Sequence, residues 1–195
     1  MADFETSYTK TLTAEGGYAN VPGDRGGETY RGIARRMHPG WGGWKIIDGH
    51  KGEPDFPRCL DRDELLQAQV REFYLQEFWN PLRLAPIPSQ AVADEMFDTG
   101  VNMGQGVAVK CLQQALNLMN GNGKYWPELA VDGRIGPGTL GVLEKCCKRG
   151  WDCELVTWMN VLQGARFVEI MRQDPTQEDF ARGWSRRIEF KKSVA

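Results

Sequence analysis

Apolar residues recur at helical intervals along most of this 195-residue chain, and this spacing is its strongest constraint on the fold. In residues 2–14, Phe4, Tyr8 and Leu12 recur every four positions and form one apolar stripe. The same periodicity predicts helices over residues 61–79, 89–101, 107–120, 138–149 and 152–173, and a last helix after Pro175. Strong strand alternation does not appear. The sequence therefore predicts a mainly α fold.

The segment after the first helix has a different composition. Residues 16–58 are rich in Gly, Pro and Trp and hold few periodic apolar residues. We expect loops here with a short hairpin. A long loop region inside a compact domain is usually functional or disordered, and Trp41 and Trp44 indicate that this one is ordered. We expect one region over residues 1–100 and a helical region over residues 101–195 packed against it.

Two helix starts carry capping signals. Asp61 with Glu64 forms a capping-box pattern, and Leu60 and Leu65 stand where a hydrophobic staple would be. Near the end of the chain, Thr176 with Asp179 predicts a capped helix after Pro175.

Composition excludes several classes of protein. Hydrophobic residues make up 41% and charged residues 26%, which is typical of a globular chain. The net charge of -2 does not favour nucleic acid as a partner. The basic residues after position 181 indicate either a solvated helix face or attraction to an anionic polymer.

The cysteines and histidines argue against a disulfide framework and a metal site. The chain has five cysteines, an odd number, without a CxxC pair, and only two histidines, His38 and His50. We expect reduced, mostly buried thiols, no metal and no cofactor.

The N-terminus and the hydropathy pattern give an expected location. The first residues lack the basic start and apolar run of a signal peptide, and no stretch approaches the roughly 20 apolar residues of a membrane span. We expect synthesis in the cytoplasm and no stable membrane insertion.

One carboxyl group suits the chemistry of glycoside hydrolysis. That reaction needs a protonated carboxylic acid at the leaving oxygen and a second group that activates water, attacks the sugar or stabilises its charge. Glu15 stands at the end of an apolar helix, and Gly16 and Gly17 leave room for a polymer. Asp24 and Thr29 follow in a turn-rich stretch that could bring them across a cleft. A glutamate at a helix end is, however, usually a solvated surface residue.

A series of short motifs resembles glycoside hydrolase family 108, a family of N-acetylmuramidases that includes proteins first labelled putative secretion activators. The resemblance covers about residues 8–190, and its motifs occur in the family's order. The catalytic part matches at Glu15-Gly16-Gly17-Tyr18, Asp24-Arg25-Gly26-Gly27, Thr29 and Gly32-Ile33. The later part resembles a peptidoglycan-binding region at Phe97-Asp98, Val101-Asn102-Met103-Gly104, 112–116, 132–136, Thr139-Leu140, and Gly183-Trp184 with Arg187.

The resemblance implies roles for the first group of residues. It makes Glu15 the catalytic residue, and the order Glu, Asp, Thr is similar to that of phage-type lysozymes. Eight residues separate Glu15 from Asp24 and four separate Asp24 from Thr29, a second gap one residue shorter than in those enzymes. Asp24 and Thr29 would then position the attacking water of an inverting enzyme. The chain departs from the family pattern at Glu28, Tyr30 and Ala34, which puts substrate preference in doubt.

Four further residues are candidates for substrate binding. Tyr18 could line the cleft or pack against the first helix, and Tyr30 is a second tyrosine candidate. Asp98 and Asn102 stand one helical turn apart and could face the cleft floor, and Asn102 could bind an N-acetyl group or cap a helix end.

Two other features also have alternative interpretations. Trp41 and Trp44 could stack on sugars or form a local core. The Asp132-Gly133-Arg134 stretch is typical of a turn and lacks the further acidic positions of a calcium loop.

These observations predict a lysozyme-like peptidoglycan hydrolase that cleaves the β-1,4 bond between N-acetylmuramic acid and N-acetylglucosamine, with glycan strands as its partner. The expected biological setting is a phage or prophage endolysin that is released through a holin-made pore and acts on the cell wall in the periplasm or outside the cell. The alternatives are a lytic transglycosylase that uses the same Glu15, and a non-catalytic peptidoglycan-binding or secretion-associated protein.

Overall fold

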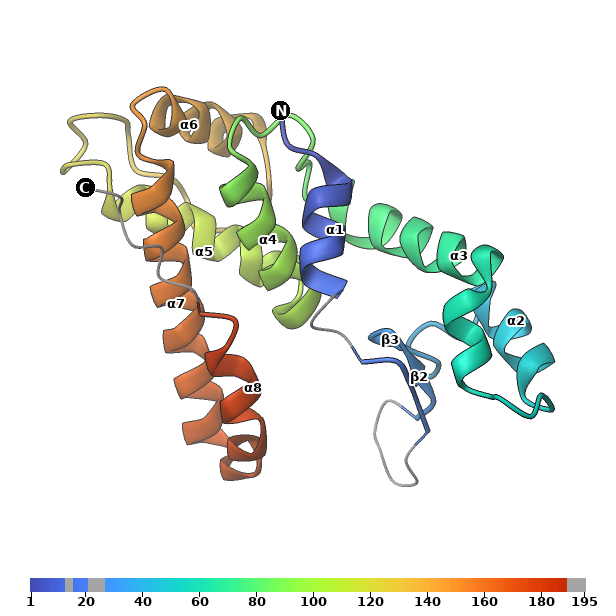
Figure 1. The fold of residues 1–195 in the computed structure, drawn as a ribbon. Helices are drawn as coiled ribbons and strands as arrows, with labels where there is room; N and C mark the ends of the chain where they lie inside the picture. The colour runs from blue at the N-terminus through green and yellow to red at the C-terminus, as the bar shows by residue number, and fades with distance from the viewer. Residues whose placement is uncertain (13–15, 21–26, 189–195) are drawn as a thin grey trace, which may run out of the picture. The chain divides into compact units, whose positions relative to one another are not determined.

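The computed structural model describes residues 1–12, 16–20 and 27–188, and it is mainly helical, as predicted (Figure 1). In these residues the α-helices are α1 (Phe4–Leu12), α2 (Gly43–His50), α3 (Glu64–Tyr74), α4 (Gln90–Met103), α5 (Gln105–Leu118), α6 (Pro137–Cys147), α7 (Asp152–Gln173) and α8 (Ala181–Ser185). Shorter helical turns are η1 (Arg58–Arg62), η2 (Leu75–Trp79) and η3 (Pro175–Phe180).

A small antiparallel sheet follows the first helix and confirms the expected hairpin. Its strands β1 (Tyr18–Ala19), β2 (Thr29–Tyr30) and β3 (Ile33–Ala34) are hydrogen-bonded in the order β1-β2-β3. Tyr30 pairs with Ile33, so Arg31 and Gly32 form a two-residue turn, with φ angles of 45° and 78°. Positive φ at both turn residues matches the twist of the flanking strands, and Gly32 adopts it without a steric penalty.

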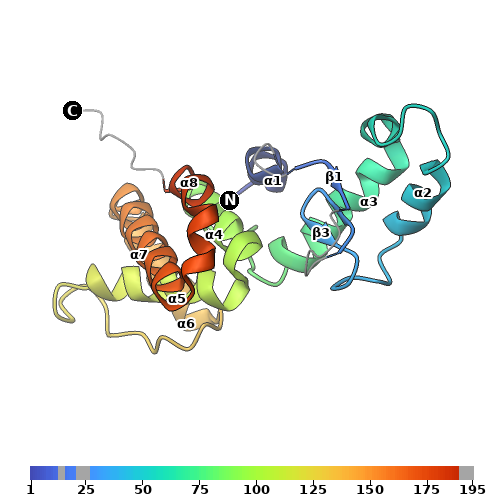
Figure 2. The ribbon, with the colours of Figure 1, turned by 90° about the horizontal axis from the view of Figure 1, so that it is seen from below.

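The described chain divides into two compact units. The first comprises residues 1–7 and 78–195, and the second residues 8–77. In the first unit, α4 packs against both α5 and α7, and α8 lies beside α7 in both views (Figures 1 and 2). Buried apolar side chains fill this core, among them Met96, Phe97, Leu112, Leu116 and Met159. The predicted division into residues 1–100 and 101–195 stays a prediction.

The second unit contains a helix that the sequence analysis did not predict. Helix α2 occupies residues 43–50 of the stretch expected to form loops. Trp44 and Ile47, one turn apart, are buried in a core with Leu66 and Val70 of α3. Gly43 and Gly49 lower the helix propensity of this segment, so tertiary burial rather than local preference stabilises it.

The predicted start of the next helix was wrong by two residues. Asp63, not Asp61, is the N-cap of α3, because its side chain accepts a hydrogen bond from the backbone N–H of Leu66. The predicted staple is also absent here, since Leu60 is buried and Leu65 is 63% exposed. Residues 58–62 form η1 instead.

The last predicted helix begins differently as well. Asp174 caps η3 by accepting a hydrogen bond from the backbone N–H of Thr176, and the α-helix starts only at Ala181. Trp184 of α8 stacks on Phe167 of α7, with ring centroids 4.6 Å apart, which fixes α8 against α7.

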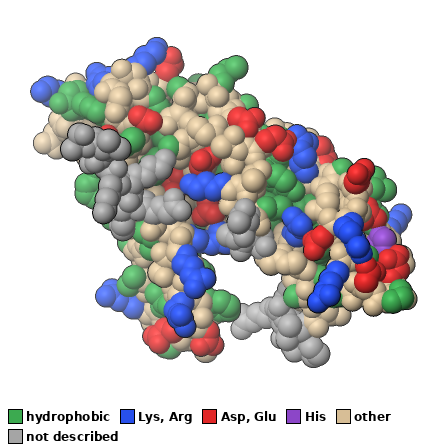
Figure 3. All heavy atoms as spheres, in the orientation of Figure 1, with side chains coloured by type: hydrophobic (Ala, Val, Ile, Leu, Met, Phe, Trp, Pro, Cys, Tyr) green, Lys and Arg blue, Asp and Glu red, His purple; other side chains and the backbone are tan. Residues whose placement is uncertain are grey.

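The visible surface carries charges of both signs, and three of the cysteines are buried. Acidic and basic side chains are interspersed over the described surface that is visible in Figure 3. All five cysteines are free, and Cys59, Cys111 and Cys146 are buried. Among the described residues, no helix is both long and apolar enough to cross a membrane.

Candidate active site

The two predicted catalytic carboxyl groups, Glu15 and Asp24, lie outside the described residues. The residues after Glu15 are described: Gly16 and Gly17 are exposed, and a Cβ added at either would meet open space. The backbone N–H of Arg31 donates to the carbonyl of Gly17 at 3.3 Å, which ties the Glu-Gly-Gly-Tyr motif to the β2–β3 turn. The chain next to Glu15 is therefore fixed in the second unit and unobstructed at its glycines.

Tyr18 is held at its ring and at its hydroxyl. Its ring packs edge-to-face on Phe56, with centroids 4.8 Å apart, and its hydroxyl donates to Oε1 of Glu28 at 2.9 Å. Burial and the bond to Glu28 both raise the pKa of Tyr18 above its ordinary value. Tyr18 therefore remains a neutral hydrogen-bond donor.

Glu28 is a site residue that the sequence analysis noted only as a departure from the family pattern. Its side chain is 9% exposed and pairs with Arg35 at 2.6 Å and with Lys51 at 2.9 Å. Burial opposes its ionisation, but the hydrogen bonds from Lys51, Arg35 and Tyr18 outweigh burial and lower its pKa. Glu28 is therefore an ionised acceptor and is unsuited to donate a proton.

Asp48 completes this charge network. It pairs with Arg35 at 2.5 Å and with Lys51 at 2.7 Å, and these bonds hold its pKa well below the ordinary value. Two carboxylates thus share two cations next to the sheet. Glu28 directly precedes β2, Arg35 directly follows β3, and Asp48 and Lys51 lie in α2 and directly after it, so the network fastens the sheet to α2.

Thr29 and Tyr30 are neighbours on β2 with different environments. The Thr29 hydroxyl lies 3.5 Å from the carbonyl oxygen of Ala19, at the weak end of hydrogen bonding, and the side chain is half-buried. Tyr30 is 1% exposed; its hydroxyl donates to Leu60 O at 3.3 Å and accepts from Gln67 at 2.9 Å. The structure thus places Thr29 near the surface and Tyr30 inside the core.

The two tryptophans of the loop-rich segment form a local core. Trp44 is 2% exposed, and its indole N–H donates to the carbonyl of His38 at 2.8 Å. Trp41 packs edge-to-face on Trp44 and on Phe73, with centroid distances of 5.1 and 6.2 Å. Of the two interpretations of these rings, the structure supports the packing role.

Asp98 and Asn102 belong to the first unit, whereas Tyr18, Thr29 and Tyr30 belong to the second. Asp98 forms an ion pair with Arg187 at 2.8 Å, and both side chains are half-buried. The Asn102 amide donates to the backbone carbonyl of Asp98 at 2.7 Å. Asp98 thus anchors the segment after α8 on α4, and Asn102 caps a carbonyl near the end of its own helix.

The Asp132-Gly133-Arg134 stretch is a turn, as the sequence predicted. Asp132 accepts a hydrogen bond from the backbone N–H of Arg134, and Gly133 has a φ of 74°. Buried Gln113 secures the turn, because its amide donates to Asp132 and its carbonyl accepts from the Gly133 N–H.

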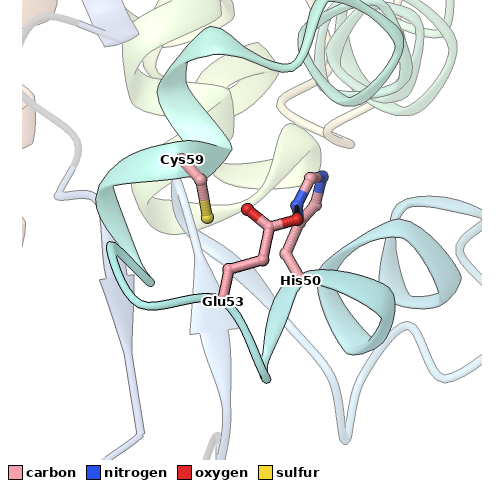
Figure 4. A group of neighbouring side chains, drawn as sticks. All are labelled: His50, Glu53 and Cys59. Atoms are coloured by element: carbon pink, nitrogen blue, oxygen red, sulfur yellow. Dashed lines mark hydrogen bonds and ion pairs between the residues drawn. The ribbon is translucent and has the colours of Figure 1, made fainter.

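The described residues also include one group that could hold a metal ion. His50, Glu53 and Cys59 each offer a ligand atom, and these atoms all lie within 4.8 Å of one another (Figure 4). The three residues belong to the second unit.

Comparisons with known proteins agree with this architecture. Residues 8–104 match the family model of glycosyl hydrolase 108, and residues 107–189 match that of a predicted peptidoglycan domain. A solved structure described as Brucella abortus SagA is similar over 98% of both chains, with a TM-score of 0.56 and 20% sequence identity. At that identity the likeness establishes a shared fold. A search of curated proteins found no match.

Proposed function

Because this chain belongs to glycosyl hydrolase family 108 and continues into a peptidoglycan-binding domain, we propose that it hydrolyses the β-1,4 bond between N-acetylmuramic acid and N-acetylglucosamine. The family makes it a glycoside hydrolase, and the second domain makes peptidoglycan its partner. The observation that carries the finer proposal is the Glu-Gly-Gly-Tyr motif at residues 15–18, inside the matched catalytic region.

Glu15 is the proposed general acid. It would protonate the leaving glycosidic oxygen while positive charge develops on the sugar. The open space beside Gly16 and Gly17 supports this proposal, because a polysaccharide must bring its backbone close to the acid. The bond from Arg31 to Gly17 supports it too, since a catalytic group needs a fixed chain next to it.

Asp24 and Thr29 are the proposed partners that position water. The half-buried Thr29 hydroxyl has only a long contact with Ala19, so rotation could turn it toward a water without loss of a strong bond. Glu28, directly before Thr29, is held by three partners and stiffens this end of β2. Because its pKa is lowered, we assign Glu28 to a structural role at β2 and not to proton donation.

Two of the predicted substrate-binding residues fit a structural role better than direct contact with the glycan. Tyr30 is buried with both hydroxyl interactions satisfied inside the core, so we assign it to positioning β2. Asp98 pairs with Arg187 and helps to fix the segment directly after α8. Tyr18 and Asn102 stay as proposed glycan contacts, the former through its ring and the latter through its amide oxygen.

Mass spectrometry of digested peptidoglycan tests the reaction. A muramidase yields fragments with a reducing N-acetylmuramic acid, heavier by one water than the anhydro products of a lytic transglycosylase. Hydrated products support the proposal, whereas anhydro products would replace hydrolysis by transglycosylation. If the turbidity of a cell-wall suspension does not change, the protein would instead be a non-catalytic peptidoglycan-binding protein.

A further inference from the structure

We propose that His50, Glu53 and Cys59 form a binding site for a borderline-soft divalent transition-metal ion of the Zn²⁺ class. The ligand atoms are an imidazole nitrogen, a carboxylate oxygen and a thiol sulfur, all within 4.8 Å of one another. Figure 4 shows the Glu53 carboxylate between the Cys59 sulfur and the His50 ring. This site is independent of the proposed glycan chemistry.

The ligand types select the class of ion. Thiolate sulfur and imidazole nitrogen suit Zn²⁺, whereas Mg²⁺ and Ca²⁺ prefer sets made of oxygen alone. Around Zn²⁺, ligand atoms at roughly 2.0–2.3 Å from the metal stand about 3.3–3.8 Å apart in a tetrahedron. The upper limit of 4.8 Å exceeds this spacing by about 1 Å, a difference that side-chain rotation can close. Three protein ligands leave a fourth position for water.

The arrangement around His50 supports a ligand role independently. His50 Nε2 lies 2.8 Å from Oδ2 of Asp63, and its Nδ1 lies 2.7 Å from Oε1 of Glu53. A carboxylate on one ring nitrogen, with the other nitrogen facing the ion, is the outer-shell arrangement common to zinc-bound histidines. Asp63 is itself fixed, because its other oxygen caps α3 at Leu66 N.

The backbone brings the ligands together from three packed segments. His50 is the last residue of α2, and Cys59 lies in η1. Glu53 lies in the turn after α2, and its backbone N–H donates to the His50 carbonyl at 2.9 Å. Helix α2 contacts both η1 and α3. Cys59 is 7% exposed while Glu53 is 44% exposed, so the site is anchored in the core and open to solvent on one side.

Without metal, the group is an ion bridge in which His50 lies between Glu53 and Asp63, and the Cys59 thiol interacts with the Glu53 carboxylate. A cationic His50 between Glu53 and Asp63 would be satisfied without any thiol. Metal binding instead uses Cys59, whose sulfur forms a bond to the ion as its proton leaves for solvent, and His50 Nδ1 likewise gives up its proton if it carries one. The thiol therefore distinguishes the two possibilities.

Titration of the reduced, chelator-treated full chain with Co²⁺ tests the site. We expect one equivalent to bind at micromolar protein, with a near-ultraviolet thiolate-to-cobalt band that Zn²⁺ abolishes by competition. Cys59→Ser should lose this band, and Cys153→Ser, which removes an exposed thiol elsewhere, should keep it. His50→Gln should lose tight binding, whereas His38→Gln should bind as the wild type does.

Asp63→Asn provides a variant that preserves the fold, because Asn is as good an N-cap as Asp. It should keep the cobalt band but bind about 10–100-fold more weakly. Far-UV circular dichroism of each metal-free variant checks folding. Absence of the band in the wild type, an unchanged band in Cys59→Ser, or equal affinity in folded Asp63→Asn would overturn the proposal.

Discussion

The hydroxyl of Tyr18 donates to Oε1 of Glu28 at 2.9 Å, which joins the last residue of the Glu-Gly-Gly-Tyr motif to the residue directly before Thr29. The bond spans the segment that contains Asp24. Tyr18 lies on β1 and Thr29 on β2, and the two strands pair directly. The two chain segments that lead to the proposed catalytic residues are thus fixed to each other.

Glu28→Gln should destabilise the protein by about 1–3 kcal/mol, because a neutral amide keeps the Tyr18 contact but leaves the Arg35 and Lys51 interactions without a negative charge. Urea unfolding measures the loss. Asp61→Asn is the matched control: it removes the charge that pairs with Arg31, but Asp61 is 60% exposed, so its effect should stay below about 1 kcal/mol. Equal effects of the two substitutions would contradict the supporting role of Glu28.

The ionised Glu28 carboxylate should make the stability of the folded protein sensitive to acid. The folded-state pKa of Glu28 is lowered from 4.5, so its stabilising contribution is complete above pH 4.5 and is lost as pH falls through the folded-state value. Melting temperature should therefore fall more steeply below pH 4.5 in the wild type than in Glu28→Gln. Parallel curves for the two proteins would show that Glu28 contributes nothing to this pH dependence.

A fragment of residues 1–100 should not fold cooperatively. The cut removes α5 and α7, against which α4 buries Met96 and Phe97. It also leaves Glu95 without Asn160 and Thr99 without Gln163, which are hydrogen-bonded at 2.7 and 3.0 Å. Thermal melting followed by circular dichroism checks this. A soluble fragment with a sharp transition and cell-wall activity would show that the first 100 residues are self-sufficient.

Helical periodicity predicted the fold class because long amphipathic helices depend on burial of one face. Helix α7 matches its predicted range, residues 152–173. Helix α2 was missed because it has only eight residues, two of them glycines besides the buried Trp44 and Ile47, so its signal is shorter than the window that reveals periodicity. Asp63 was missed as an N-cap because Asp61, two positions earlier, offers an equivalent pattern.

Residues of the candidate active site could be predicted only where they belong to a motif that is contiguous in the sequence. The Glu15 and Asp24 assignments rest on such motifs and stay predictions. The environment of Glu28 depends on Arg35 and Lys51, which only the folded chain brings together. The same holds for the metal proposal. The sequence analysis counted only two histidines and expected no metal, while Cys59 and Asp63 reach His50 through the packing of η1 and α3 on α2.

Asp24→Asn should lose most activity and keep its fold if Asp24 positions the attacking water. In an inverting enzyme the two carboxyl groups stand roughly 6.5–9.5 Å apart to admit that water, whereas about 5–5.5 Å separates them in a retaining one. The first sugar released by the wild type should therefore have the inverted anomeric configuration, observed by NMR before mutarotation. A retained anomer would exclude the inverting course, and full activity of the variant would leave Asp24 a loop residue.

The most direct test of the proposed chemistry is a muropeptide digest by the wild type and Glu15→Gln side by side. The amide is nearly isosteric with the carboxyl group but cannot act as an acid, and loss of a general acid typically lowers the rate by roughly 10²–10⁴-fold. We predict hydrated muropeptides from the wild type and almost none from Glu15→Gln, with closely similar melting temperatures. Release of the same products at near-wild-type rate by a folded Glu15→Gln protein would contradict the assignment of Glu15 as the catalytic acid.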